Sequence, residues 1–240
     1  MTDDETLDAR REKYNAIREK LADLYGYPRW RQHYPPVDEL VLTILSQNTS
    51  DHNSIRGFKN LKDRYDTWEK VRDAPREDLI EAIRTAGLAK QKSGFIQNAL
   101  NQITEEQGAI TLDFLNEMPV DEAKDWLTGI KGIGPKTASI VLLFSLNKPA
   151  FPVDTHIHRV SRRLGLIGPK VNREKAHEIL EAIAPAEDYY PLHLQLIQHG
   201  REICGASNPK CGICPLQDDC DWFNSLDPDA RADKLAAATD

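Results

Sequence analysis

Four cysteines lie close together near the C-terminal end of the 240-residue chain, and they are its only cysteines. They are Cys204, Cys211, Cys214 and Cys220, separated by six, two and five residues. A disulfide pair is one use for such thiols, but no secretory signal indicates the oxidising compartment that disulfides need. Four-cysteine zinc sites usually consist of two close pairs, whereas here two cysteines flank one central Cys-x2-Cys. Because a [4Fe-4S] cluster takes one cysteine on each iron, this spacing favours an iron–sulfur cluster over zinc.

A glycine-rich segment from Leu127 to Ala138 has a composition suited to binding an anion. Gly132 and Gly134 allow a tight turn that brings backbone N–H groups close to a phosphate. Pro135 suits the first position of a following helix. Glycine turns also join helices that bind nothing, so the segment indicates a phosphate site only in combination with other signals.

Lys136 follows this turn and would occupy the second position of the next helix. The positive end of the helix dipole and the nearby Lys131 disfavour an ammonium there, which favours the nucleophilic neutral amine. A lysine at such a place is more often solvated or in contact with a phosphate, and that alternative stays open on the residues alone.

Asp154 lies eighteen residues after Lys136, directly before an apolar-periodic segment. An aspartate at this position is a good helix N-cap, whose side chain accepts a hydrogen bond from a free backbone amide. Nearby histidines could suggest a metal, but no further ligand accompanies them at metal-binding spacing, so contacts in the core or to a DNA backbone are favoured. These histidines are His156, His158, His193 and His199.

The elements that must position these residues are helical. Apolar residues recur three and four positions apart over 7–24, 37–45, 55–61, 79–83 and 95–103, and no segment has the alternation of a strand. Prolines and glycines separate about ten such segments. We therefore expect an all-α fold with short connections, followed by a frayed polar tail over 229–240.

Charge is unevenly distributed in a chain whose formal net charge is −7. Residues 129–170 carry seven Lys and Arg against the single Asp154, whereas residues 218–240 carry seven Asp against two basic residues. A local basic stripe can attract nucleic acid in an acidic protein, although it can also be a solvated helix face. No apolar segment reaches the roughly 18 residues of a membrane helix, so we expect no membrane association and a cytoplasmic location, on the nucleoid in a prokaryote.

From about Pro28 to Trp222 the motifs together resemble the endonuclease III-like DNA glycosylases of the helix-hairpin-helix superfamily. The resemblance implies a [4Fe-4S] cluster on the four cysteines and a hairpin at Leu127–Ala138 that grips the DNA backbone. It also implies that Lys136 is the nucleophile, because lyase-competent members have lysine at this place. Asp154, in the context Val-Asp-Thr-His, would be the catalytic carboxylate.

Two further segments resemble the parts of this family that enter the duplex. Gln47 or Asn48 would fill the space of the flipped base, and Leu88 would be an apolar wedge, unless it is a buried helix-terminal leucine. Lys131 and His158 depart from residues that are common in the family, which leaves the preferred damaged base open. The remaining contacts to DNA that the resemblance implies are Lys131, Gly132, Gly134, His156, Arg159 and Lys210.

The resemblance implies two helical domains on either side of a DNA-binding cleft: a barrel domain at 37–147, and a cluster domain formed by 1–36 with 148–240. We expect a monomeric DNA N-glycosylase and AP lyase that acts on double-stranded DNA with damaged bases or abasic sites, and excises oxidised pyrimidines. A monofunctional mismatch or alkyl-base glycosylase and a non-catalytic DNA-binding module are the alternatives.

Overall fold

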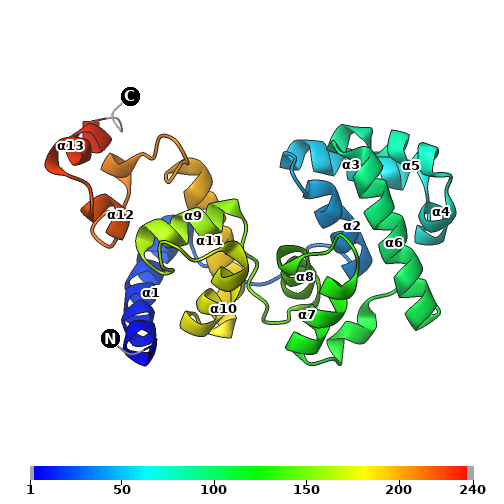
Figure 1. Ribbon diagram of the computed structural model, residues 1–240, viewed down its shortest axis with the longest axis horizontal. Coiled ribbons are helices and arrows are strands. Elements are labelled where there is room, and N and C mark those ends of the chain that lie inside the picture. Colours follow the sequence, from blue (N-terminus) through cyan, green and yellow to red (C-terminus); the bar gives the residue numbers. More distant parts are fainter. Residues whose placement is uncertain (1–2, 237–240) are drawn as a thin grey trace. The chain divides into compact units, whose positions relative to one another are not determined.

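The computed structural model describes residues 3–236, which contain helices, turns and loops but no β-strand (Figure 1). The all-α prediction is therefore confirmed for the described residues. The chain divides into two compact units, one of residues 31–150 and one of residues 1–30 with 151–240. The domain limits predicted from the sequence, at 36/37 and 147/148, remain predictions.

The unit of residues 31–150 is built around one buried helix, α2, whose apolar side chains are almost all removed from solvent. Helices α3, α6 and α8 and the π-helical turn η3 contact α2. The turn η3 directly continues α8. The elements of this unit are α2 (Pro36–Ser46), α3 (Asp51–Arg64), α4 (Trp68–Asp73), α5 (Arg76–Ala82), η1 (Arg84–Ala86), α6 (Ala89–Gln107), η2 (Asp113–Asn116), α7 (Val120–Gly129), α8 (Pro135–Ile140) and η3 (Val141–Ser145).

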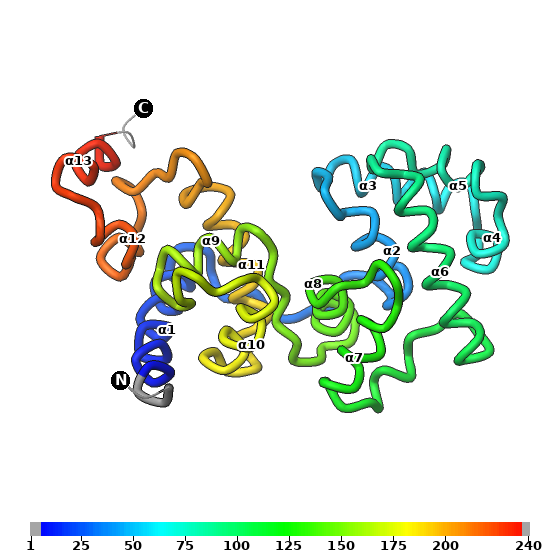
Figure 2. Tube along the Cα trace, viewed as in Figure 1, coloured from blue at the N-terminus to red at the C-terminus, as the bar shows by residue number. Residues whose placement is uncertain are grey.

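The other unit joins the two ends of the chain. Its N-terminal helix α1 packs against α10 and α11, and Figure 2 shows this blue segment beside the yellow ones. Helix α9 packs against α11 and α12. The elements are α1 (Asp3–Tyr25), α9 (Thr155–Leu164), α10 (Arg173–Ile183), η4 (Ala186–Asp188), α11 (Tyr189–Glu202), η5 (Cys211–Ile213), α12 (Asp221–Asn224) and α13 (Pro228–Ala236).

Side-chain caps begin several helices where the sequence offers an oxygen acceptor. Ser50 accepts a hydrogen bond from the Asn53 amide at the start of α3, and Asn172 accepts one from the Lys175 amide at the start of α10. Gly108 and Gly165 end α6 and α9 at positive φ. These local signals place helix ends, while burial of apolar faces supplies most of the stability.

The predicted frayed tail is wrong for residues 229–236, which form most of α13. Asp227 accepts a hydrogen bond from the Ala230 amide at 2.8 Å, so the helix has a capped start. Arg231 then ties the helix to the carbonyl oxygens of Asn224 and Leu226. The sequence pattern missed this helix because it is held by polar contacts and has no buried face. Residues 237–240 lie outside the described part of the chain.

No helix among the described residues is both long enough and apolar enough to cross a membrane.

Candidate functional site

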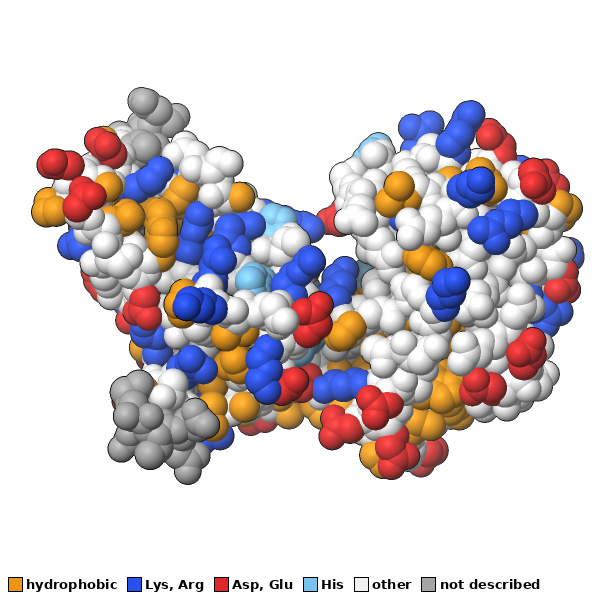
Figure 3. Space-filling model, viewed as in Figure 1, with side chains coloured by type: hydrophobic (Ala, Val, Ile, Leu, Met, Phe, Trp, Pro, Cys, Tyr) orange, Lys and Arg blue, Asp and Glu red, His pale blue; other side chains and the backbone are white. Residues whose placement is uncertain are grey.

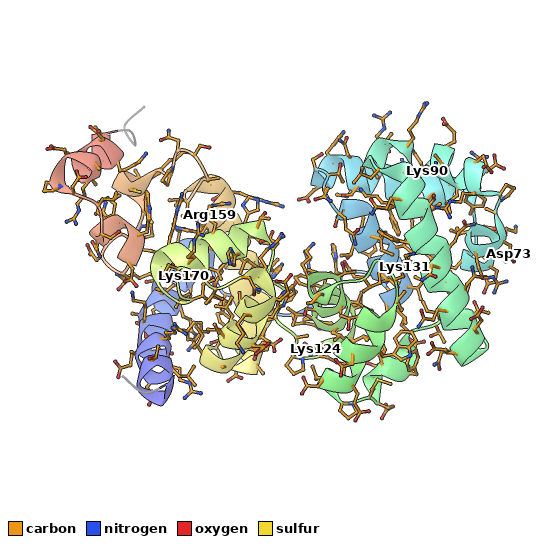
Figure 4. The ribbon with its side chains drawn as sticks, viewed as in Figure 1. Asp73, Lys90, Lys124, Lys131, Arg159 and Lys170 are labelled. Carbon is orange, nitrogen blue, oxygen red and sulfur yellow. The ribbon has the colours of Figure 1, made fainter. Side chains whose placement is uncertain are left out.

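The glycine-rich segment forms a turn between α7 and α8, as the sequence predicts. Ile130 and Ile133 are buried, which anchors the turn on both sides of Gly132. Gly132 adopts φ +96°, and a Cβ at this position would overlap the ring of Phe95. Lys131 is exposed at the turn and is labelled in Figure 4. The turn therefore requires glycine at 132 and presents a cation beside it.

Lys136 lies at the second position of α8, after Gly134 as N-cap and Pro135 as the first helical residue. Its side chain is half-buried. The first amides of a helix have no partner within the helix and form the positive end of its dipole. Lys136 is thus an amine set beside groups that can bind an anionic phosphate.

Asp154 is the N-cap of α9, and its Oδ1 accepts a hydrogen bond from the Ile157 amide at 2.8 Å. The segment before it is buried and held by hydrogen bonds that also place this carboxylate. The Phe151 amide donates to Glu181 Oε1 at 2.8 Å. Lys136 belongs to the unit of residues 31–150, whereas Asp154 belongs to the unit that contains α9.

Two histidines hold the backbone that leads to Asp154. His177 Nδ1 lies 2.8 Å from the Phe151 carbonyl oxygen, and His193 Nδ1 lies 3.1 Å from that of Pro152. Both rings are buried, and each nitrogen must donate its proton to the carbonyl. His193 therefore has the core role that the sequence favoured. His177 was missed because nothing in its spacing distinguishes it from a surface residue of α10.

His156 and Arg159 face α11 from the first turns of α9. The Arg159 guanidinium donates to the carbonyl oxygens of Cys204 at 3.1 Å and Gly200 at 2.7 Å, and lies 3.1 Å from His156 Nδ1. Figure 4 labels Arg159 on its helix. Arg159 thus braces α9 against the end of α11 through its Nε and Nη2. A predicted contact to a DNA phosphate would use the N–H groups of its guanidinium that these bonds leave over. Its DNA contact and that of His156 stay predictions.

Gln47 and Asn48, the two neighbouring wedge candidates, differ in burial and in hydrogen bonding. Gln47 is half-buried and its Nε2 donates to the Gly132 carbonyl oxygen at 3.1 Å. Asn48 is exposed and adopts φ +52°. The side chain of Gln47 thus serves the hairpin, while that of Asn48 reaches solvent.

Leu88 is an exposed apolar side chain on the same unit. It is 53% exposed and adopts φ +49° at the start of α6. The alternative of a buried helix-terminal leucine is therefore wrong. Exposed leucine in a left-handed conformation is unusual, because bulky residues rarely adopt positive φ.

The four cysteines line one pocket with residues of α9, α11 and α12. Cys214 Sγ lies 3.6 Å from Nε2 of the buried His199. Burial raises the pKa of the Cys214 thiol to about 12, and neighbouring cysteines contribute to the rise. Burial also lowers the pKa of His199 to about 4, so its ring is neutral. Thiols in this pocket ionise when a cation compensates their charge, which iron does.

The donor set fits an iron–sulfur cluster better than a single ion. A zinc ion needs its four sulfurs at about 2.3 Å, whereas a cubane binds each cysteine through a different iron. Among the described residues no three His, Cys, Asp or Glu side chains are placed to hold one metal ion. The cysteines nevertheless share one pocket. Four thiols that line one pocket fit a [4Fe-4S] cluster, which takes one cysteine on each iron.

Arg163 holds the cysteine segment in place, a role that was missed from the sequence. Its guanidinium donates to the carbonyl oxygens of Gly205 at 2.7 Å and Ala206 at 2.9 Å, and lies 3.3 Å from Cys204 Sγ. It also stacks 4.6 Å from the centroid of the Trp222 ring. The sequence indicated only that Arg163 belongs to the basic stripe of residues 129–170, because its partners lie about forty or more residues away along the chain.

Basic side chains gather on the visible face of the unit that contains α9, as the blue surface in Figure 3 shows. Arg162, Lys170 and Lys210 are exposed in this unit. Lys210 directly precedes Cys211, and its backbone amide donates to the Ile203 carbonyl oxygen at 2.9 Å. The predicted local concentration of positive charge is therefore present despite the net charge of −7.

The chain is similar to known DNA repair proteins along most of its length. The profile of the family described as HhH-GPD superfamily base excision DNA repair protein matches residues 41–186, and the iron-sulfur binding domain of endonuclease III matches residues 204–220. Endonuclease III of Sulfolobus acidocaldarius is 33% identical over 89% of this chain and 92% of the relative. Endonuclease III of Thermotoga maritima is 34% identical over 82% of this chain and 88% of the relative.

A relative from Arabidopsis thaliana is 38% identical over 77% of this chain, which spans 64% of that relative's length. Among solved structures, a non-covalent endonuclease III–DNA complex matches with a TM-score of 0.75 and 29% identity, over 88% of this chain and 95% of that one.

The chain belongs to the HhH-GPD superfamily of base excision DNA repair proteins. Within that superfamily it is an endonuclease III-like DNA glycosylase, an enzyme that binds DNA and carries a [4Fe-4S] cluster on its C-terminal cysteines. The predicted family, enzyme class and cofactor are thereby confirmed.

Proposed function

We propose that this enzyme is a bifunctional N-glycosylase and AP lyase that excises oxidised pyrimidines from double-stranded DNA. The observation that carries the proposal is Lys136, an amine at the second position of the helix that follows the phosphate-binding turn. Two relatives of matching length are endonuclease III proteins. A solved structure of a trapped endonuclease III–DNA covalent intermediate shares the fold, with 29% identity and a TM-score of 0.75.

In this mechanism the neutral amine of Lys136 attacks C1′ of the damaged nucleotide. The C1′–N bond breaks, and its electron pair leaves with the base. Asp154 stabilises the positive charge that develops on the sugar and assists proton transfer. Loss of a proton from the nitrogen and opening of the sugar ring then produce a Schiff base between Lys136 and C1′. Removal of a C2′ proton expels the 3′ phosphate by β-elimination, and water releases the lysine.

The DNA would be held chiefly through its backbone, without reading of sequence. Amides around Gly132 and Gly134 and the side chain of Lys131 face the phosphates on one unit, and Lys210 does so on the other. His156 and Arg159 are the remaining proposed contacts. We assign the polar wedge to Asn48, because Gln47 is bound to the hairpin, and the apolar wedge to Leu88. Extrusion of the damaged base would make its glycosidic bond accessible.

The cluster residues have a positional role in this proposal. Cys204, Cys211, Cys214 and Cys220 would each bind one iron, and the cluster supplies a cross-link rather than a reactant. The loop that carries Lys210 would be held at Cys211 by that cross-link. We further propose that the enzyme acts as a monomer in the compartment that contains the DNA.

Borohydride trapping on abasic DNA tests the lyase assignment. Reduction of the Schiff base should leave a covalent adduct with the wild-type enzyme. Lys131→Gln, a substitution in the turn just before α8, should also form the adduct. Lys136→Gln should give no adduct, yet should retain abasic-DNA binding because the hairpin amides remain. An adduct at wild-type yield from Lys136→Gln would identify another amine as the nucleophile. Absence of any adduct from a wild-type enzyme that excises bases would favour the monofunctional alternative.

Single-turnover excision on matched duplexes tests the substrate class. Thymine glycol and other ring-saturated or oxidised pyrimidines should be released faster than alkylated purines or adenine opposite an oxidised guanine. Damaged bases that stack poorly are easier to extrude, so a fairly open pocket can still favour them. Faster release of an alkylated purine would assign the enzyme to another branch while leaving the lyase chemistry in place. Lys136→Gln controls for contaminating glycosylases.

A further inference from the structure

Lys92 is a buried lysine in the first turn of α6. Its side chain is 1% exposed, which makes it one of the largest fully buried side chains among the described residues. Its Nζ donates hydrogen bonds to the carbonyl oxygens of Leu45 at 2.7 Å and Ala86 at 2.6 Å. An ammonium is seldom buried unless its protons have acceptors, and these two carbonyl oxygens are the acceptors here.

The two acceptors lie in the last turns of the elements that precede the wedge candidates. Leu45 lies in the last turn of α2, three residues before Asn48. Ala86 is the last residue of η1, two residues before Leu88. Carbonyl oxygens at the end of a helix have no partner within it and form the negative end of its dipole. One cation therefore satisfies the ends of two elements at once.

Both loops that follow contain a residue at positive φ. Asn48 and Leu88 have φ of 52° and 49°, and Asn147 is the only other described residue besides glycine at positive φ. Asparagine adopts this conformation readily, but a bulky residue such as Leu88 keeps it only where the surrounding structure holds it. A shared tie immediately before each residue is a means of holding both.

We infer that Lys92 is a positioning residue that couples the loop of Asn48 to the loop of Leu88 and so fixes both side chains for entry into the duplex. The role in DNA entry rests on the proposed function, whereas the coupling of the loops rests on the hydrogen bonds alone. Lys92 donates to Leu45 across 47 residues and to Ala86 across six, so it links two separate parts of the chain.

A lysine serves this role where an apolar side chain of similar length would not. An apolar residue could fill the same space in α6, but it would leave two inward carbonyl oxygens without a donor. Burial lowers the pKa of Lys92 to about 8. The neutral amine still has two N–H groups, so the tie to both oxygens survives loss of the proton.

Amide hydrogen exchange on the free enzyme tests the coupling. Lys92→Met keeps the length of the side chain and removes its donors, while Leu100→Ala removes a buried apolar side chain eight residues further along the same helix, outside both loops. The two variants are compared under conditions where their stabilities are equal. The amides of residues 46–50 and of residues 86–90 should then exchange at least 10-fold faster in Lys92→Met than in Leu100→Ala. Leu100→Ala should change neither loop selectively. Faster exchange in one loop only, or in neither, would overturn the coupling.

Lys92→Gln is the second variant, for use if Lys92→Met does not fold. Its amide retains two N–H donors on a shorter side chain, so it can reach only one of the two carbonyl oxygens. One loop should then exchange at the wild-type rate and the other faster. Wild-type exchange in both loops would show that the lysine is not required for the tie.

Fluorescence of 2-aminopurine placed opposite the lesion separates the role in DNA entry from the coupling. Lys92→Met should slow extrusion about 10-fold, and Leu88→Ala should have a smaller effect in the Lys92→Met background than alone. Multiplicative effects would overturn the positioning role. If Asn48→Ala and Leu88→Ala extrude bases at the wild-type rate while Lys92→Met loosens both loops, the proposed wedges are wrong and the coupling stands.

Discussion

Gln47 donates a hydrogen bond from its side-chain amide to the carbonyl oxygen of Gly132, at 3.1 Å. The bond joins the segment after α2 to the hairpin between α7 and α8. Gln47 and Gly132 are 85 residues apart in sequence. The bond engages the side chain of Gln47, whereas the side chain of Asn48 is exposed, and this difference is why we propose Asn48 as the wedge. The same bond gives the carbonyl oxygen of Gly132, within the hairpin, a side-chain partner.

Gln47→Ala should therefore act mainly on stability, and Asn48→Ala should act mainly on the rate of excision. Loss of the Gln47 bond removes a partner of the hairpin and should lower the free energy of unfolding by about 1 kcal/mol. Asn48→Ala places alanine at φ +52°, a conformation that asparagine tolerates better, so it should lower the free energy of unfolding by about 0.5–1 kcal/mol while slowing excision several-fold per folded molecule. Urea denaturation and single-turnover excision measure the two effects. If Gln47→Ala slows excision more than Asn48→Ala at equal folded fraction, Gln47 is the wedge.

Gly132→Ala should destabilise the unit of residues 31–150 by about 2 kcal/mol or more. The substitution places a Cβ in a left-handed conformation and against the Phe95 ring, so both strain and overlap contribute. Gly134→Ala is the matched control, since a Cβ there meets nothing within 4 Å and φ is −102°. Thermal unfolding should show a clear difference between the two variants. Equal stability of both would mean that the turn is freer than its packing indicates.

Local signals made much of the fold predictable, whereas the ties between distant segments were not. The apolar stripe of 37–45 predicts a buried α2, and Asp154 predicts the start of α9, because both effects act over a few neighbouring residues. The bonds of Lys92 to Leu45 and of Gln47 to Gly132 join residues 47 and 85 positions apart. No periodicity or spacing encodes such a pair, and only the tertiary packing reveals it.

Iron content should respond to Arg163 but not to its exposed neighbour Arg162. The purified enzyme should contain about four irons and four sulfides per chain and be yellow-brown. Arg163→Met removes two carbonyl contacts and the stacking on Trp222, so the segment around Cys204 should loosen and the cluster should be lost faster on exposure to air. Arg162→Met should match the wild type.

Metal analysis and the decay of visible absorbance measure this prediction. Stoichiometric zinc without iron after anaerobic preparation would contradict the cofactor. Equal cluster lifetimes for Arg163→Met and Arg162→Met would instead limit Arg163 to a surface role. The comparison is informative because both arginines lie on α9 and carry the same charge.

Asp154 combines a helix cap with a proposed catalytic charge, and substitution can separate the two. Asp154→Asn keeps an oxygen that can accept from the Ile157 amide, so stability should stay within about 0.5 kcal/mol of the wild type. It removes the negative charge, so excision should slow by about 10²- to 10³-fold. Asp154→Ala removes both functions and should also lower stability by about 1 kcal/mol.

Asn172→Ala supplies the matched control for the cap. Asn172 caps α10 in the same unit, where its side chain accepts from the Lys175 amide at 2.8 Å. This variant should lose about 1 kcal/mol of stability and excise bases at the wild-type rate per folded molecule. Affinity for abasic DNA should change little in Asp154→Asn or in Asn172→Ala, because the proposed role of the Asp154 carboxylate lies in the cationic transition state. If Asp154→Asn excises at the wild-type rate per folded molecule, capping is the whole role of Asp154 and another group must stabilise the charge on the sugar.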